Sequence, residues 1–308
     1  MKKNILIIGG TRFFGKLLVK KLLNEGHRVT IATRGVAKDD FGDGVLRLQL
    51  DRRNQATMYD TFSKLDGYDM VYDQVCYTPI DAKISCDVFA GKVGRYVMAS
   101  TIETYAELSH ENIRRRYRED DLILASLSGN ADDDWRVDGF AARHYGLGKR
   151  LGEATLYRDA SFPVVSIRIP HVLAGPEDFT GRLAFYVHLA MRGEILWHSP
   201  DAGSSSFTTA EAIADFMCWT GTESFSGPVN APSCGELSAP DIFRQVGRVL
   251  GRDVQMQAAE RPTQASELSP FDYPHLYCMD SAHAASLGYA FDTNPTWLNE
   301  LISQHIAA

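Results

Sequence analysis

The sequence predicts an α/β protein with a doubly wound parallel sheet, followed by a smaller and less regular C-terminal lobe. Three observations lead to this fold class. Short apolar runs alternate with helical patterns of about 10–15 residues, the order expected when a helix follows each strand of a parallel sheet. A glycine-rich turn joins the first apolar run to the first helical pattern. After Pro170 this alternation stops, and glycine, proline and serine become frequent.

The first strand–helix–strand unit lies at the N-terminus. Residues 4–8 are an apolar run ending at glycines, which is typical of a strand buried on both faces. The leucines at 17, 18, 22 and 23 then recur at helical spacing as far as Gly26, which we interpret as a helix C-cap. Residues 29–33 follow as a second strand, so the segment predicts a βαβ unit.

The same alternation continues to Pro170, interrupted by a polar and irregular stretch over residues 106–138. Further strands are predicted at residues 45–50, 70–75, 96–99 and 164–169, with helices at 55–65, 81–91 and 145–159. We therefore expect a sheet domain over residues 1–170. Residues 171–308 should form mainly a substrate-binding lobe, with some segments returning to the sheet domain. Ligands of open α/β sheets bind at the carboxyl ends of the strands.

Composition and charge restrict the functional class. The chain has 308 residues, 44% apolar and 23% charged, as in ordinary soluble globular proteins. No apolar run reaches the roughly 18 residues of a membrane span, and the N-terminal run is too short for a signal peptide. We therefore expect a cytoplasmic protein that does not enter a membrane. The net charge is −7, and the one basic cluster, residues 114–118, runs into an acidic segment. We interpret this cluster as a solvated turn, because nucleic-acid binders usually have a basic surface.

The cysteines do not indicate a metal site. Cys76, Cys86, Cys218, Cys234 and Cys278 form no CxxC pair and no cluster with zinc-like spacing. We expect reduced and mostly buried thiols, and no metal.

The glycine-rich turn predicts a dinucleotide site. Such a turn lets backbone N–H groups and the N-terminus of the following helix face a pyrophosphate. The apolar strand before it and the amphipathic helix after it are the context that this interpretation requires. A plain strand-to-helix turn is the alternative. The predicted cofactor-binding residues here are Gly9, Gly10, Thr11, Arg12, Phe13, Phe14 and Gly15.

The end of the second strand favours NADP over NAD. An Asp or Glu usually binds the ribose 2′-hydroxyl of NAD at this position, but the sequence has Thr33-Arg34-Gly35. Arg34 and Arg12 could bind a 2′-phosphate through charge-assisted hydrogen bonds. Two unrelated surface arginines are the alternative interpretation, and NAD is then the alternative cofactor.

Tyr145 and Lys149 form a candidate acid–base pair. Their spacing of four residues places a phenol and an ammonium group on one face of a predicted helix. A nearby cation stabilises a phenolate and lowers the pKa of the phenol, which makes it usable as an acid or base near neutrality. The spacing by itself is common. Its position downstream of a dinucleotide turn and just before the last parallel strand makes it informative.

Together these motifs resemble the extended short-chain dehydrogenase/reductase family, the NAD-dependent epimerase/dehydratase group. The motifs that carry the resemblance are Gly9-Gly10…Gly15, Ala99-Ser100-Thr101…Tyr105, Tyr145…Lys149…Glu153, Arg168-Ile169-Pro170…Gly175-Pro176, Gly227-Pro228-Val229-Asn230 and Asp280-Ser281…Leu287-Gly288-Tyr289. The resemblance implies a Rossmann-type fold and an oxidoreductase or isomerase that acts on a small molecule, such as a nucleotide sugar. It leaves the oligomeric state open, a homodimer included.

The resemblance also implies roles for individual residues. Thr101 matches the catalytic Ser/Thr that hydrogen-bonds the reacting substrate oxygen, and Tyr145 matches the general acid/base. Lys149 would bind the nicotinamide ribose and tune Tyr145. Glu153, one helical turn further on, is interpreted as part of an ion pair on the helix surface.

Four further assignments follow from the family. Asp51, after the third strand, matches the residue that contacts the adenine amine. Cys76 lies in the loop that lines the cofactor after the fourth strand. His171 lies at the position where, in the family, a residue packs behind the nicotinamide. Arg182 belongs to the lobe that binds nucleotide phosphates in the family, which makes it a candidate substrate contact.

Two departures bear on the reaction. Arg12 replaces the middle glycine of the usual turn, a form most like an atypical branch that includes chloroplast stem-loop RNA-binding proteins and bacterial relatives. The alternative function is therefore a non-enzymatic, cofactor-binding RNA-binding or redox-regulatory protein. The complete set of Thr101, Tyr145 and Lys149 favours an enzyme, because a non-enzymatic module does not need all three.

Ile102 and Glu103 follow Thr101, where the family's 4,6-dehydratases carry an Asp-Glu pair. Isoleucine cannot protonate a leaving hydroxyl, so epimerisation or reduction is favoured over dehydration. Glu103 resembles the glutamate of the family's sugar-nucleotide decarboxylases and is a candidate substrate contact. A loop glutamate that faces solvent is the alternative.

Overall fold

A computed structural model describes residues 2–108, 115–127, 133–259 and 269–308. The chain divides into two compact units. Unit 1 comprises Met1–Ala106, Glu119–Ile169 and Glu211–Val229, and unit 2 comprises Glu107–Arg118, Pro170–Ala210 and Asn230–Ala308.

Unit 1 is built on a seven-stranded sheet with the order β10-β6-β5-β4-β1-β2-β3. Strands β1 to β6 pair with one another in parallel. The strands are β1 (Asn4–Ile8), β2 (Arg28–Thr33), β3 (Val45–Gln49), β4 (Met70–Asp73), β5 (Tyr96–Thr101), β6 (Val164–Ile169) and β10 (Gly227–Asn230). The predicted Rossmann-like α/β fold class is confirmed.

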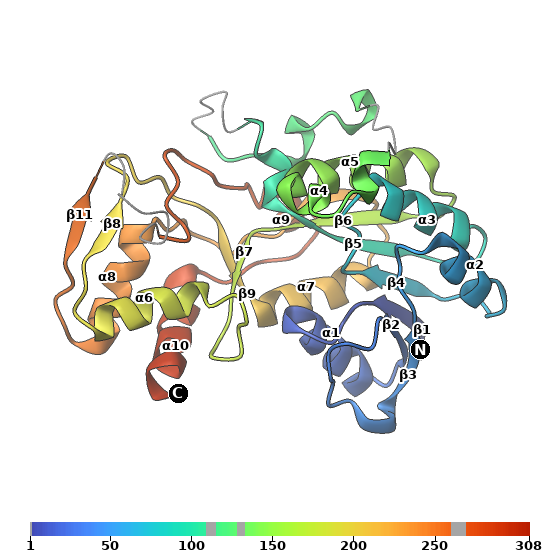
Figure 1. The fold of residues 1–308 in the computed structure, drawn as a ribbon, viewed down its shortest axis with the longest axis horizontal. Coiled ribbons are helices and arrows are strands. Elements are labelled where there is room, and N and C mark those ends of the chain that lie inside the picture. Colours follow the sequence, from blue (N-terminus) through green and yellow to red (C-terminus); the bar gives the residue numbers. More distant parts are fainter. Residues whose placement is uncertain (1, 109–114, 128–132, 260–268) are drawn as a thin grey trace. The chain divides into compact units, whose positions relative to one another are not determined.

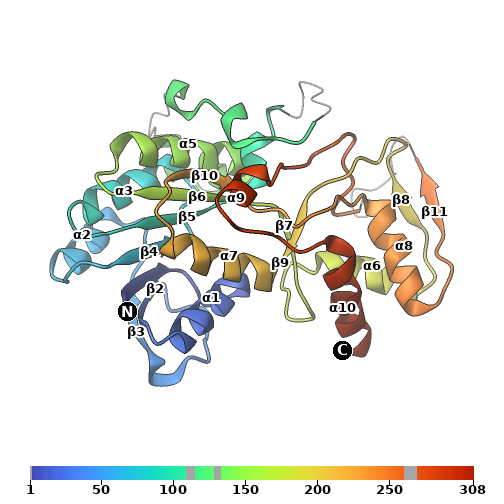
Figure 2. The ribbon, with the colours of Figure 1, turned by 180° about the vertical axis from the view of Figure 1, so that it is seen from behind.

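Helices cover both faces of this sheet (Figure 1). One face carries α2 (Gln55–Ser63), α3 (Pro79–Phe89) and α5 (Tyr145–Asp159), and the other carries α1 (Phe13–Asn24) and α7 (Ala210–Thr222). Figure 2 shows the same arrangement from behind. A salt bridge of 2.5 Å between Lys21 and Asp215 joins α1 to α7. The short helix α4 (Phe140–Arg143) precedes α5.

The core of unit 1 includes β1, whose apolar run is buried on both faces of the sheet. Leu6 and Ile8 pack with Met58 and Phe62 of α2 in one buried cluster. Ile7 points to the other face of the strand, where its side chain lies beside Gly10. Each fully buried aliphatic side chain contributes about 1.5–3 kcal/mol relative to an exposed one.

Two element boundaries differ from the sequence prediction in ways that matter for the site. The strand expected at residues 70–75 ends at Asp73, because the Asp73 carboxylate accepts a hydrogen bond of 2.9 Å from Val75 N and turns the chain. The helix expected at residues 81–91 begins at Pro79, because Thr78 and Asp81 form a capping box.

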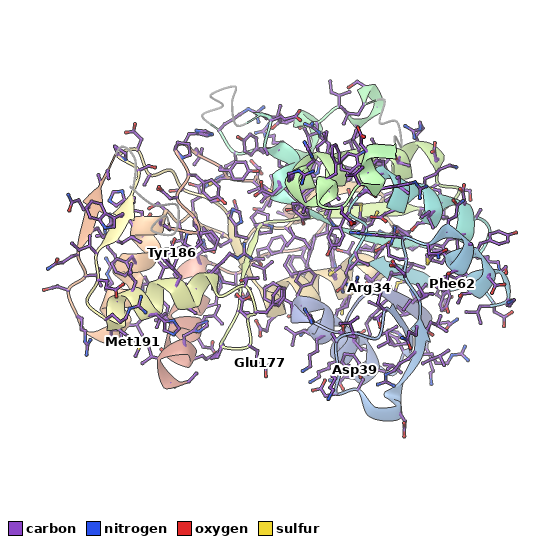
Figure 3. All side chains as sticks on the ribbon, in the orientation of Figure 1. Arg34, Asp39, Phe62, Glu177, Tyr186 and Met191 are labelled. Carbon is purple, nitrogen blue, oxygen red and sulfur yellow. The ribbon has the colours of Figure 1, made fainter. Side chains whose placement is uncertain are left out.

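Unit 2 contains two small parallel sheets and a cluster of helices. Strand β7 (His171–Leu173) pairs with β9 (Phe207–Thr209), and β8 (Leu196–His198) pairs with β11 (Met256–Ala258). Its helices are α6 (Arg182–Met191), α8 (Ala239–Leu250), α9 (Ala282–Ser286) and α10 (Asn294–Ala307). Apolar side chains of α6, α8 and α10 form its core, which includes Tyr186 of α6 (Figure 3).

The described residues contain neither a membrane-spanning helix nor a cluster of metal ligands. None of their helices is long and apolar enough to cross a membrane. No group of three or more His, Cys, Asp or Glu side chains in this part of the chain could hold a metal ion. All five cysteines are free, and Cys76, Cys86 and Cys278 are buried.

Candidate functional site

The glycine turn has the backbone geometry of an anion-binding turn. Gly9 and Gly10 have φ angles of +99° and +90°, which side-chain-bearing residues rarely adopt. A Cβ on Gly10 would also lie 2.9 Å from Cγ2 of Ile7. The N-cap residue of α1, Arg12, makes no side-chain capping bond, and the first turn has no acidic residue. The positive end of the helix dipole is therefore not neutralised locally.

Gln74 lies against this turn and was missed by the sequence analysis. A Cβ on Gly15 would lie 1.9 Å from Oε1 of Gln74, and one on Gly9 would lie 3.4 Å from its Cβ. The Nε2 atom of Gln74 is buried and has no hydrogen-bond partner among the described residues. An unsatisfied buried donor next to a glycine turn fits a ligand that carries anionic oxygens. No local sequence signal pairs Gln74 with Gly15, because they belong to different crossovers.

The two residues directly after β2, Arg34 and Gly35, include a cation and no carboxylate. Arg34 and Asp39 lie in the connection between β2 and β3 (Figure 3). Asp39 is bound by Arg47 at 2.6 Å, and this hydrogen bond lowers the pKa of the Asp39 carboxyl. The exposed guanidinium groups of Arg34 and Arg12 make no side-chain hydrogen bond within the described part of the chain.

The structure brings Tyr145 and Lys149 together on α5. Tyr145 is the first residue of the helix and is 37% exposed, whereas Lys149 is only 2% exposed. Lys149 Nζ donates a hydrogen bond of 2.6 Å to the carbonyl oxygen of Ala99 on β5. The same nitrogen lies 5.8 Å from the ring centroid of Tyr145 and 4.6 Å from that of Tyr77. The ammonium group is thus held against two aromatic rings beneath the surface.

Thr101 lies at the end of β5, beside the start of α5. Thr101 is the N-cap of the short helix η2 (Ile102–Tyr105), and its Oγ1 accepts a hydrogen bond of 3.3 Å from Glu103 N. A Cβ on Gly146 would lie 2.2 Å from the carbonyl oxygen of Glu103. Only glycine at this position lets α5 approach the turn so closely, so Gly146 is a site residue that sequence analysis missed. Glu103 itself is half-buried.

Glu153 is not part of a surface ion pair, which corrects the sequence interpretation. Its side chain and that of Arg168 on β6 are both fully buried, with 2.8 Å between Oε2 and Nη2. Ser100 donates a hydrogen bond to the same carboxylate, and Arg168 Nη1 donates one of 2.7 Å to the hydroxyl of Tyr105. Glu153 faces the sheet rather than solvent, so this network joins the helix carrying Tyr145 to the strand carrying Thr101.

The other predicted contacts are distributed over both units. In unit 1, Asp51 is exposed after β3 and accepts a hydrogen bond of 2.9 Å from Arg53 N. The Cys76 side chain is fully buried in the core, and this burial raises the pKa of its thiol.

His171 and Arg182 belong to unit 2. His171 Nε2 is hydrogen-bonded to the hydroxyl of Tyr273 at 2.8 Å, and burial lowers the pKa of His171 to about 3. The Arg182 guanidinium lies 5.5 Å from the ring centroid of Phe271 and donates a hydrogen bond to the carbonyl of Val172.

The basic cluster is only partly within the described residues, since Arg114 lies outside them. Arg115, Arg116 and Arg118 are exposed, and Tyr117 between them is buried. Arg116 forms a salt bridge of 2.5 Å with Glu236 in unit 2.

Comparison with known proteins identifies relatives by sequence. Residues 5–122 match the model of the NAD dependent epimerase/dehydratase family. A curated relative is the chloroplast stem-loop binding protein of 41 kDa b of Arabidopsis thaliana, which is 40% identical over 85 residues. That match covers 23% of this chain and spans only 22% of the relative's length.

Solved structures resemble the whole chain at low identity. The UDP-glucose 4-epimerase of Thermus thermophilus, solved with NAD, has a TM-score of 0.68 at 16% identity, covering 99% of both chains. The UDP-N-acetylglucosamine 4-epimerase of Bacillus cereus has a TM-score of 0.71 at 19% identity, also covering 99% of both chains. The dTDP-glucose 4,6-dehydratase of Bacillus anthracis, solved with NAD, gives 0.73 at 13%, over 99% of this chain and 96% of that one. At these identities the likeness shows the fold alone.

Proposed function

We propose that this protein is an NADP(H)-dependent enzyme that epimerises or reduces a nucleotide sugar, as the match of residues 5–122 to the NAD dependent epimerase/dehydratase family model suggests. The observation that carries the proposal is the Tyr145–Lys149 pair beside Thr101. The three groups come from α5 and the end of β5, on the edge of the sheet where open α/β folds bind ligands.

The residues of the glycine turn fit a dinucleotide. Gly9 and Gly10 leave space that a Cβ would fill, and the buried Nε2 of Gln74 lacks a partner within the described residues. A pyrophosphate would supply acceptors for that amide and for the N-terminus of α1. Arg34 and Arg12 favour a 2′-phosphate on the adenosine ribose, because both are exposed cations and the acidic residue typical of NAD sites is absent.

Tyr145 is assigned to proton transfer at a substrate hydroxyl. Its ring is exposed enough to meet a ligand, and the Lys149 ammonium lies 5.8 Å from the ring centroid, where positive charge favours the phenolate. Thr101 would hold the reacting oxygen by a hydrogen bond. A nicotinamide, when bound, supplies the hydride acceptor and donor. Removal of the hydroxyl proton by Tyr145 then accompanies oxidation of the carbinol carbon to a ketone.

Ile102 disfavours dehydration. Elimination of water needs a proton donor for the leaving hydroxyl, and the buried Ile102 side chain has none. Glu103 is half-buried beside Thr101 and is proposed as a substrate contact. Arg182 is the proposed contact to the nucleotide phosphates, although its guanidinium already binds the carbonyl of Val172.

A second candidate function is a nucleic-acid-binding protein that uses the same fold. The observation in its favour is the 40% identity to a chloroplast stem-loop binding protein over 85 residues. The net charge of −7 opposes it, as does the pairing of Arg116 with Glu236. RNA binding that weakens steeply between two salt concentrations would support this second function.

The proposed reaction is tested with a panel of UDP- and dTDP-sugars in deuterated water, read by mass spectrometry and cofactor absorbance. An epimerase changes sugar configuration without net change in absorbance, whereas a reductase consumes NADPH stoichiometrically. Tyr145→Phe should lose this activity. Tyr59→Phe is its matched control, because Tyr59 is an exposed tyrosine on α2 and is not one of the proposed site residues. Loss of water with deuterium gained beside a new keto group would contradict the role given to Ile102. Absence of any cofactor binding would contradict the enzyme itself.

A further inference from the structure

The loop of residues 74–78, between β4 and α3, contacts both halves of the proposed site. Toward the glycine turn, a Cβ on Gly9 would lie 3.5 Å from Cγ1 of Val75. Toward the acid–base pair, the Tyr77 ring centroid lies 4.6 Å from Lys149 Nζ and 6.1 Å from the Tyr145 ring centroid. This short loop therefore contacts both the glycine turn and the Tyr145–Lys149 pair.

Two carboxylates hold the backbone of the loop, one at each end. Asp73 Oδ1 accepts a hydrogen bond of 2.9 Å from Val75 N. Asp81 Oδ2 accepts bonds of 2.9 Å from Tyr77 N and 3.1 Å from Thr78 N. The exposed fractions are 0% for Asp73 and 1% for Asp81, so both negative charges need a partner inside the protein.

Arg52, which follows β3, is that partner for both. Its Nη2 donates a hydrogen bond to Asp73, and its Nη1 lies 2.9 Å from Oδ1 of Asp81. Ser85 Oγ accepts a further bond of 2.9 Å from Nη2, and the Tyr96 hydroxyl donates one of 2.6 Å to Asp73. Burial lowers the pKa of Arg52, but the charges of Asp73 and Asp81 outweigh this effect, so the guanidinium stays protonated.

We propose that Arg52 is a positioning residue of the site, which fixes loop 74–78 by bridging the carboxylates at its two ends. The role in cofactor binding rests on the proposed function, whereas the clamp on the loop does not. A planar guanidinium can serve two carboxylates at once, and an ammonium group on a single stem cannot do so in the same geometry. Without the arginine, both buried carboxylates would lose their counter-charge.

The test compares Arg52→Lys and Arg52→Met with Arg53→Gln, a matched control on the adjacent exposed arginine. Hydrogen exchange of the Val75, Tyr77 and Thr78 amides reports the loop, and exchange of the β1 amides reports global opening. NADPH affinity is measured by fluorescence in parallel. We expect Arg52→Lys to speed loop exchange by about tenfold while β1 is unchanged, because local opening is separate from global unfolding. The Kd for NADPH should rise by about tenfold.

Arg52→Lys keeps the positive charge, so it should fold even if Arg52→Met does not. A lower melting temperature with unchanged loop exchange and unchanged NADPH affinity would overturn the proposal, since Arg52 would then act on stability alone. The same effects in Arg53→Gln would also overturn it. If the wild-type protein binds no dinucleotide, the proposed function fails, and the amide exchange still decides whether Arg52 holds the loop.

Discussion

Glu153 and Arg168 form an ion pair with 2.8 Å between Oε2 and Nη2, and neither side chain is exposed to solvent. The pair joins α5 to β6, so the helix that carries Tyr145 and Lys149 is anchored to the sheet through two buried charges. A pair of this kind contributes little compared with apolar packing, but breaking it leaves one charge uncompensated in the interior.

We therefore expect Glu153→Gln to lower the free energy of unfolding by about 3–5 kcal/mol, as measured for other broken buried pairs. Urea denaturation followed by circular dichroism measures this loss. The control is Asp60→Asn, which removes an exposed ion pair between α2 and its C-cap residue Lys64 and should cost only about 0.3–0.5 kcal/mol. Equal effects of the two substitutions would contradict the role assigned to the buried pair.

Gly10 should tolerate substitution poorly, for two separate reasons. Gly10→Ala combines a φ of +90° with a Cβ only 2.9 Å from Ile7 Cγ2. Gly26→Ala is a matched control, because Gly26 has a φ of +82° but nothing within 4 Å of the added Cβ. Backbone strain should cost roughly 1–2 kcal/mol in both, and overpacking about 1–3 kcal/mol more in Gly10→Ala alone. Thermal or urea unfolding of both variants checks the difference, and equal losses would rule out crowding.

Tyr145→Phe should abolish turnover and leave dinucleotide binding nearly unchanged, because the proposed function gives the phenol only the task of moving a proton. Lys149→Ala should weaken both turnover and dinucleotide binding, since the Lys149 ammonium is proposed to hold the nicotinamide ribose and to favour the Tyr145 phenolate. Rates on the substrate found in the panel, together with fluorescence titration of NADPH, separate the two effects. A Tyr145→Phe rate above about a tenth of wild type would exclude Tyr145 as the acid/base, whose loss costs about 10²–10⁴-fold.

NADPH should bind at least about tenfold more tightly than NADH, which corresponds to ~1.4 kcal/mol. The reason is the exposed cation of Arg34 at the end of β2, where no free carboxylate lies. Arg34→Ala should remove most of this preference by weakening NADPH binding alone. Equal affinities of the wild-type protein for both cofactors, or a preference for NADH, would contradict the assignment.

His171 should make unit 2 less stable in acid. Burial, with a smaller effect of the Arg182 charge, lowers the pKa of His171 from 6.5 to about 3. Below pH 6.5, His171 is therefore protonated in the unfolded chain, whereas in the folded chain it stays neutral down to about pH 3. The contribution of His171 to the free energy of unfolding is therefore constant above pH 6.5. Below pH 6.5 this free energy falls by up to about 1.4 kcal/mol per pH unit.

Urea midpoints between pH 4 and pH 7 measure this slope. His171→Gln should flatten it, whereas His188→Gln, which changes an exposed histidine of α6, should leave the slope unchanged. An equal slope in wild type and His171→Gln would show that other groups control the acid sensitivity.

The sequence by itself was sufficient to predict the fold class, most strands and helices of the sheet, and the local chemistry of two segments. These features depend on residues close together in the chain. The glycine turn is read from Gly9 to Gly15, and Tyr145 and Lys149 are one helical turn apart. The apolar run of residues 4–8 and the helical pattern of residues 145–159 predicted β1 and α5 with the bounds that the structure has, because such patterns lie within one segment of the chain.

Only the tertiary structure decided which charges are buried and what they hold. Glu153 was expected at a surface, and Arg52 was not singled out at all, because their partners come from other crossovers. Strands β3 and β4, which lead to Arg52 and Asp73, are separated in the sheet by β1 and β2. No local pattern can pair residues across two strands, and a charge can remain inside a protein only where the packed fold brings its partners to it.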